Sequence, residues 1–230
     1  MKLFNKICVP AALTLAMAAA VSCSDNDDEN AGWTELIKVA TYNIQYDNQS
    51  VEAGKWDNRK GLMQKMLKDC DFDIFGVQEP YKFQIDDIVS WFPEYGWVGA
   101  SISGESEKER VHYNPIFYRK DRFTVLDNGM FWYSETPDVV NSKGWDSYSV
   151  RMCNWVKFKD NRNGKIFFHF NSHFDHKGET ARLESAKLLV SKVKEIAADY
   201  PSFCTGDYNT DQTSAPYQII IMSDLMDSYS

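Results

Sequence analysis

Two polar side chains at the end of a short apolar run form the most chemically informative stretch of the sequence. The run over residues 201–205 stops at Gly206, and Asp207 and Asn209 follow it, a pattern typical of a buried strand that ends in a turn. Side chains two apart on an extended backbone point the same way, so Asp207 and Asn209 would face one site. A carboxylate beside a carboxamide suits a divalent cation and a phosphoryl oxygen. A polar turn with no further role is the alternative interpretation.

Three more runs of strand-forming residues also end in polar side chains, namely Asn43, Glu79 and His173. Proline directly follows Glu79 and would end that strand. Singly, each group has a structural explanation: Asn43 as a turn cap, Glu79 as a solvated acid, and His173 as a hydrogen-bonded core histidine. Because four runs end in this way, we expect these side chains to meet at the C-terminal ends of neighbouring strands.

The rest of the chain supplies the elements that would hold these groups. The apolar patterns predict strands at 36–45, 73–80, 95–99, 115–118, 151–158 and 165–173, and helices at 56–67, 83–91, 180–198 and 215–222. Leu62 is expected on the apolar face of the first helix. The Asn163-Gly164 pair predicts a hairpin turn. The aromatic, turn-rich stretch 123–149 predicts a hairpin and a long loop at the rim of the sheet. Residues 36–230 contain no repeat or linker and are expected to form one domain.

The N-terminus has the pattern of a secretory signal. Lys2 and Lys6 precede an apolar stretch over residues 7–21, which is too short and too poorly flanked for a membrane span. Residues 1–22 are therefore expected to be a signal peptide that takes no part in the fold.

The end of this signal resembles the lipobox of bacterial lipoproteins. Small residues lead into Cys23, although Ala20 stands where the usual leucine would be. We therefore expect Cys23 to be lipidated and residues 23–35 to form an acidic tether. The exported protein would be anchored in the outer membrane or at the cell surface. An ordinary secretory signal with a chance cysteine is the alternative.

Composition limits the classes of partner. The chain of 230 residues is 43% hydrophobic and 14% aromatic, enough for one sizeable core, and its formal net charge is −8. No dense tract of Lys and Arg is present, whereas tight binding of nucleic acid rests on clustered basic charge. Nucleic acid is therefore a partner that the composition does not favour, and no protein partner is indicated. Cys70, Cys153 and Cys204 are widely spaced and show no zinc-site pattern.

The motifs together resemble the endonuclease/exonuclease/phosphatase superfamily, and the segments 131–137 and Gly144-Trp145 look like its secreted bacterial branch. The resemblance runs from Ile37 onward and rests on four stretches, Thr41-Tyr42-Asn43-Ile44, Val77-Gln78-Glu79, Asn171-Ser172-His173-Phe174-Asp175-His176 and Thr205-Gly206-Asp207-Tyr208-Asn209. It implies a four-layer α/β sandwich of the deoxyribonuclease type, in which two packed, mostly antiparallel mixed sheets are flanked by helices. The implied substrate is a phosphate ester.

The resemblance also implies roles for individual residues. Glu79 matches the main Mg²⁺ ligand of the family, and Asn43 the residue that helps to hold the metal–phosphate assembly; Mn²⁺ and Ca²⁺ are alternative metals. His173 matches the histidine that donates to a non-bridging phosphoryl oxygen. Asp207 matches the carboxylate that orients the attacking water or assists at the metal, and Asn209 the amide that positions the phosphate.

Two further residues are placed on the substrate side. Arg151 lies where several relatives have an arginine near the substrate, and a buried structural ion pair is the alternative. His176 forms a His-x-x-His pattern with His173, a spacing that the family does not use to bind zinc.

The sequence departs from the family at its end. The family closes with an Asp-His dipeptide whose histidine is the general base. This sequence has four histidines, none of them after His176, and it stops at Ser230, where relatives usually continue. We therefore expect a domain that lacks its C-terminal Asp-His segment, in either a fragment or a truncated gene product.

From these observations we predict a Mg²⁺-dependent phosphoesterase. It would hydrolyse a phosphomonoester or phosphodiester by in-line attack of an activated water. A non-specific nuclease is one alternative. The other is a non-catalytic, phosphate-binding surface lipoprotein, if the chain truly ends at residue 230.

Overall fold

The computed structural model describes residues 36–225 and 227, which contain eight strands and four α-helices. In chain order the elements are β1 (Val39–Asn43), the 3₁₀ turn η2 (Glu52–Gly54), α1 (Trp56–Cys70), β2 (Ile74–Gln78), α2 (Lys82–Trp91), β3 (Tyr95–Val98), β4 (Ile116–Arg119), β5 (Phe123–Trp132), β6 (Met152–Asp160), β7 (Ile166–His173), α3 (Glu179–Ala197), β8 (Ser202–Asp207) and α4 (Ala215–Ile221).

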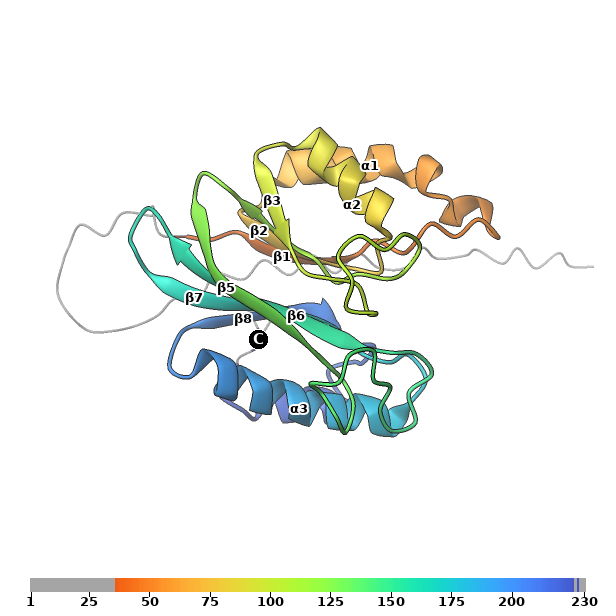
Figure 1. Ribbon diagram of the computed structural model, residues 1–230, viewed down its shortest axis with the longest axis vertical. Helices are drawn as coiled ribbons and strands as arrows, with labels where there is room; N and C mark the ends of the chain where they lie inside the picture. The colour runs from red at the N-terminus through yellow and green to blue at the C-terminus, as the bar shows by residue number, and fades with distance from the viewer. Residues whose placement is uncertain (1–35, 226, 228–230) are drawn as a thin grey trace, which may run out of the picture.

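The strands form two mixed sheets of four. The first has the order β1-β2-β4-β3 and the second the order β5-β6-β7-β8. In each sheet one pair is parallel, β1 with β2 and β7 with β8, while the other neighbours are antiparallel. Helices α1 and α2 cover the outer face of the first sheet, and α3 covers the outer face of the second (Figure 1). The predicted four-layer α/β sandwich is therefore confirmed.

Each interface between layers has its own apolar cluster. Side chains of α1 and α2, including Met63 and Ile85, pack on Phe75 of the first sheet. On the other side, Leu189 of α3 packs with Phe170 of the second sheet. A third cluster lies between the sheets and consists of Ile74, Ile116, Phe123, Val156, Phe158 and Phe167. This central cluster keeps the two sheets face to face.

A line of buried polar groups also crosses between the sheets. Gln78 of β2 donates to the Asn171 side chain of β7 at 2.6 Å, and Asn171 donates to the backbone carbonyls of Val77 and Pro115. Thr205 Oγ1 donates to Asn171 Oδ1 at 3.1 Å. A Cβ at Gly76 would lie only 2.4 Å from Thr205 Oγ1, so only glycine lets the sheets approach so closely. These bonds fix the register of one sheet against the other.

Two sequence expectations differ from the structure. Residues 123–132 form the single long strand β5, which pairs with β6, so the expected hairpin within 123–149 is replaced by one strand and a long loop. Leu62 is 74% exposed, and the buried residues of α1 are Trp56, Met63 and Leu67. In the first case, pairing of residues 123–132 with β6 overrides the local turn propensity of the stretch.

The predicted signal peptide, lipidated Cys23 and acidic tether fall outside the described residues. Within 36–225 and 227, no helix is both long enough and apolar enough to cross a membrane.

Candidate active site

Three polar side chains from both sheets meet at the C-terminal ends of β1, β2 and β8. The amide Nδ2 of Asn43 donates to Glu79 Oε1 at 3.0 Å and to Asp207 Oδ2 at 2.8 Å. Parallel pairing of β1 with β2 sets Asn43 beside Gln78, next to Glu79. Asn43 and Asp207 are 164 residues apart in sequence. The expected meeting of strand ends is therefore present, with Asn43 as the link between the two carboxylates.

A short loop after β1 supports the first-sheet half of the site. The backbone N–H of Gln45 donates to Asn43 Oδ1 at 2.9 Å, and that of Tyr46 donates to Glu79 Oε2 at 3.4 Å. Arg59 of α1 holds this loop from behind, because its guanidinium donates to the carbonyls of Ile44, Gln45, Tyr46 and Gly54. The buried Nε of Arg59 has no partner. A single cation thus fixes the backbone that orients Asn43 and Glu79.

The backbone at two site residues lies in an unusual region. Glu79 has φ of 71° and Asn209 has φ of 47°, values that few residues other than glycine adopt. Asn209 N donates to Asp207 Oδ1 at 3.0 Å, and its Nδ2 donates to the carbonyl of Phe174. Strained backbone of this kind clusters where side chains must be held for function.

His173, at the end of β7, lies between the carboxylates and a buried arginine. Its Nε2 is 3.9 Å from Glu79 Oε1 and 3.8 Å from Asp207 Oδ2. Arg151 Nη1 lies within hydrogen-bond distance of both ring nitrogens of His173, 2.9 Å from Nδ1 and 3.1 Å from Nε2. A guanidinium only donates, so the ring nitrogen that accepts from it carries no proton. Burial and the charge of Arg151 lower the pKa of His173 well below its usual value. His173 is therefore neutral at pH 7.

Arg151 connects His173 with two more side chains of the second sheet and its loops, His176 and Asp175. Its Nη2 lies 2.9 Å from His176 Nδ1, and its Nε donates to Asp175 Oδ2 at 3.4 Å. Burial lowers the pKa of Arg151 and Asp175 opposes the shift. Arg151 forms the buried ion pair with Asp175 that was the alternative interpretation, and it also lines the cavity, so a role beside the substrate stays a prediction.

Asp175 organises the loops around this arginine. Its buried carboxylate accepts from the backbone N–H groups of Ser149, Lys177 and Gly178 at 2.8–3.0 Å. Burial raises the pKa of Asp175, but the hydrogen bonds from Gly178, Ser149 and Lys177 outweigh it, and the pKa lies well below its usual value. Asp175 is therefore a permanent anion that holds two loops together.

A cavity of about 720 Å³ opens over this constellation. Glu79, Arg151, His173 and Asn209 reach its surface, and its walls are formed by Gln45, Tyr46, Tyr81, Ile102, Arg110, Val111, His112, Asn114, Tyr148, Ser149, Val150, Met152 and His176. Asn43 and Asp207 are not among the residues that line the cavity, and Asn43 contacts it through its hydrogen bond to Glu79. The space is large enough for a small phosphate ester.

The donor set fits a magnesium ion. The carboxylates of Glu79 and Asp207 both accept a hydrogen bond from the Asn43 amide. Their side chains are 19% and 30% exposed, respectively. In the described part of the chain, no three His, Cys, Asp or Glu side chains gather as a complete metal-binding group. Mg²⁺ suits such a sparse site, since it keeps several waters and takes one or two carboxylates together with substrate phosphate oxygens. That Asn43 is itself a ligand stays a prediction; its Oδ1 is occupied by Gln45 N.

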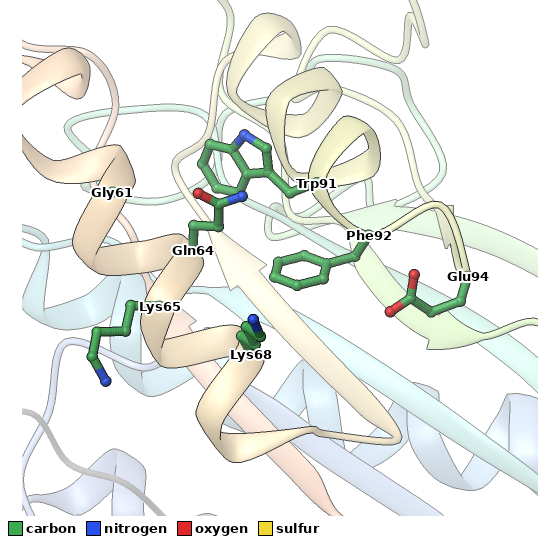
Figure 2. A pocket seen from close by; sticks show the side chains of 7 residues that line it. All are labelled: Gly61, Gln64, Lys65, Lys68, Trp91, Phe92 and Glu94. Atoms are coloured by element: carbon green, nitrogen blue, oxygen red, sulfur yellow. The ribbon is translucent and has the colours of Figure 1, made fainter.

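A second hollow lies elsewhere, between α1 and the end of α2 (Figure 2). It measures about 580 Å³ and is lined by Gly61, Gln64, Lys65, Lys68, Trp91, Phe92 and Glu94. It shares no residue with the cavity over Glu79, and the groups predicted from sequence do not reach it.

Sequence interpretation missed several groups that support the site. Arg59, Tyr46 and Tyr148 lie outside the recognised motifs, and Asp175 lies inside one of them but was assigned no role of its own. Arg59 and Asp175 act on backbone groups, and such contacts exist only once the loops are folded. Exposed tyrosines in loops offer a weak signal for binding.

Comparisons with known proteins agree with this architecture. A model of the Endonuclease/Exonuclease/phosphatase family matches residues 40–228. The structure of an endonuclease/exonuclease/phosphatase from Bacteroides vulgatus superimposes with a TM-score of 0.78 at 41% identity, covering 83% of this chain and 72% of that chain. A mannosyl-6-phosphatase from Bacteroides thetaiotaomicron superimposes with a TM-score of 0.75 at 40% identity, covering 80% and 69%.

Curated relatives are more distant. An uncharacterized protein of Acanthamoeba polyphaga mimivirus is 31% identical over 188 residues, covering 76% of this chain and 68% of that protein. The chain spans 26% to 44% of the length of six other curated relatives, which include exoribonucleases.

Proposed function

This chain belongs to the endonuclease/exonuclease/phosphatase family, and from that premise we propose that it is a divalent-metal-dependent phosphomonoesterase acting on a small phosphate ester. The observation that carries the proposal is the meeting of Asn43, Glu79, His173 and Asp207 at one end of both sheets. Two carboxylates that suit a hard cation stand beside a neutral histidine that can donate to a phosphoryl oxygen.

A phosphomonoester is favoured over a nucleic acid by two observations. The mannosyl-6-phosphatase at 40% identity is a phosphomonoesterase by its name. In addition, the chain has a formal net charge of −8, whereas binding along a polynucleotide backbone rests on clustered basic residues. Exoribonucleases among the relatives share only 23–26% identity, so nuclease activity is the second candidate.

The chemistry follows from the positions of the side chains. Glu79 and Asp207 would hold the cation, which when bound supplies positive charge against the phosphoryl oxygens. Neutral His173 donates its remaining N–H to a non-bridging oxygen, where negative charge grows during in-line attack. Asp207 orients the attacking water, whose oxygen bonds to phosphorus while the bond from phosphorus to the leaving oxygen breaks. One proton of the attacking water passes through solvent to the leaving oxygen, which departs as the alcohol, and the other stays with inorganic phosphate.

Phosphate release by the purified protein tests the proposal. With Mg²⁺ we expect turnover of mannose 6-phosphate and p-nitrophenyl phosphate, and loss of turnover with EDTA. Glu79→Gln and His173→Ala should each reduce kcat/KM by at least about 100-fold, the usual effect of removing a metal ligand or an oxyanion donor. Glu94→Gln, at the hollow between α1 and α2, is the matched control and should be unchanged.

Two outcomes would replace the proposal. Faster cleavage of single-stranded RNA than of any monoester would identify a nuclease. Binding of phosphate esters without hydrolysis of any of them would identify a binding protein.

We also propose that the protein is an exported lipoprotein anchored through Cys23. Support comes from the apolar N-terminal stretch and the small residues before Cys23. Metabolic labelling with an alkyne fatty acid should mark the wild-type protein and not Cys23→Ser. Equal labelling of both proteins would contradict the anchor.

A further inference from the structure

A largely exposed tyrosine stands beside the catalytic cavity. Tyr148 is 62% exposed and lines the cavity together with His176. The His176 ring packs edge-on against it at a centroid distance of 5.3 Å, and Lys177 Nζ lies 3.7 Å from the ring centre. A large aromatic ring next to a reaction centre offers a wide contact surface for a ligand.

The support beneath this tyrosine is rigid. The buried Asp175 carboxylate accepts from Ser149 N, directly after the tyrosine, and from Lys177 N in the next loop. His176 is fixed separately through its Nδ1, 2.9 Å from Arg151 Nη2. Exposure of Tyr148 is therefore combined with a fixed position, which is what a binding residue requires.

The loops of the first sheet form a second aromatic wall of the same cavity. Tyr46 and His112 stack on each other with ring centroids 5.1 Å apart, and Tyr81 lies 5.7 Å from His112. The Arg110 guanidinium is 5.9 Å from the Tyr81 ring centre. The exposed polar residue Gln45 also lines the cavity. Both walls thus combine flat apolar faces with hydrogen-bonding groups.

We propose that these walls bind the sugar ring of a phosphorylated monosaccharide, and that Tyr148 is a specificity-determining residue. A pyranose has C–H faces that pack on aromatic rings and hydroxyl edges that need hydrogen-bonding groups such as Gln45 and Arg110. The proposal rests on the proposed function, since the sugar is the leaving group of the phosphate ester.

A polynucleotide fits this cavity less well. Binding along a nucleic-acid backbone needs clustered basic groups, whereas the arginines that line the cavity are Arg110 and Arg151, and Arg151 is paired with Asp175.

Substrate comparison tests the role of Tyr148. Tyr148→Ala should lower kcat/KM for mannose 6-phosphate roughly tenfold, mainly through KM, which corresponds to about 1.4 kcal/mol. Glycerol 3-phosphate has no ring, and its kcat/KM should stay within about twofold, because only the ring contact is lost. Tyr148→Phe should behave as the wild type on both substrates. Tyr200→Ala is the matched control. Tyr200 is 44% exposed, and Lys157 Nζ lies 4.6 Å from its ring centre. It precedes β8, at the end of that strand opposite to Asp207.

Binding of an unreactive analogue separates this inference from the proposed function. Calorimetry should show Tyr148→Ala weakening the 6-phosphonate analogue of mannose 6-phosphate roughly tenfold while methylphosphonate affinity is unchanged. That result would support the sugar subsite even if the protein hydrolysed no ester, in which case only the proposed function would fail. Three results would overturn the subsite. The first is an equal loss of affinity for both phosphonates, and the second is no loss of affinity for the sugar analogue. The third is a nucleoside 5′-phosphate that is the best substrate and whose turnover depends on Tyr148.

Discussion

The two sheets hold their site residues by different means. In the first sheet, Asn43 and Glu79 receive hydrogen bonds from backbone N–H groups of the loop after β1, and Arg59 clamps that loop through its carbonyls. In the second sheet, His173 is held by the side chain of Arg151, which is itself bound to Asp175. In the first sheet one arginine acts on backbone carbonyls, so its loss affects only the loop, whereas a buried side-chain network loses several side-chain contacts at once.

Arg151→Met should give the largest effect and affect both stability and activity. It leaves the buried Asp175 carboxylate without its arginine and frees His173 and His176, at an expected cost of about 3–5 kcal/mol in the free energy of unfolding. Denaturant unfolding measures the loss. Arg151→Lys should recover part of the stability but little activity, because a single ammonium cannot reach both histidines. A decrease in the free energy of unfolding below about 1 kcal/mol would show that Arg151, Asp175 and the two histidines do not form a connected network.

Glu79→Gln should affect metal binding while leaving the fold intact. We expect Mg²⁺ affinity, measured by calorimetry, to fall at least about tenfold, as for loss of a charged ligand. The metal-free melting temperature should stay the same or rise, since one of two neighbouring carboxylates is removed. Unchanged Mg²⁺ affinity would place the cation elsewhere.

Arg59→Gln should have an intermediate effect on stability and metal affinity, confined to the part of the site that the first sheet supplies. The loop over residues 44–46 loses its clamp, and we expect a stability loss of about 1–3 kcal/mol with a smaller decrease in Mg²⁺ affinity than in Glu79→Gln. Arg119→Gln is the control. Arg119 is a partly exposed arginine on β4 of the first sheet and forms ion pairs with Asp71 and Asp121. Its substitution should lower the free energy of unfolding by no more than about 1 kcal/mol. Equal effects of the two substitutions would mean that Arg59 does not act through the loop.

The smallest expected effect is on the pH dependence of stability, and it arises from a buried histidine of the second sheet. Burial lowers the pKa of His169, on β7, to about 3. Below about pH 6.5 the unfolded chain takes up a proton that the folded protein refuses, so the free energy of unfolding falls as pH drops toward 3. His169→Gln should reduce the decrease between pH 7 and pH 5 by roughly 1–2 kcal/mol. An unchanged decrease would show that His169 is protonated in the folded protein.

Sequence interpretation succeeded where the signal was local. Apolar runs that end in polar residues identified β1, β2, β7 and β8, and they predicted that Asn43, Glu79, His173 and Asp207 meet. It failed where tertiary contacts decide the outcome, as for the long strand β5 and the exposed Leu62. The supporting contacts of Arg59 and Asp175 are made to backbone atoms, which sequence patterns do not encode.

The hydrogen bond between Asn43 and Asp207 has a consequence for folding kinetics. Its partners lie 164 residues apart and belong to different sheets, so closing this contact requires one of the longest loops in the chain. Contacts of such large separation form late, after local elements such as α3 and the hairpin of β6 and β7. Hydrogen exchange during refolding should therefore protect the β6–β7 pair first and the ends of β1 and β8 last. The chain acquires its reaction centre only when the sheets dock.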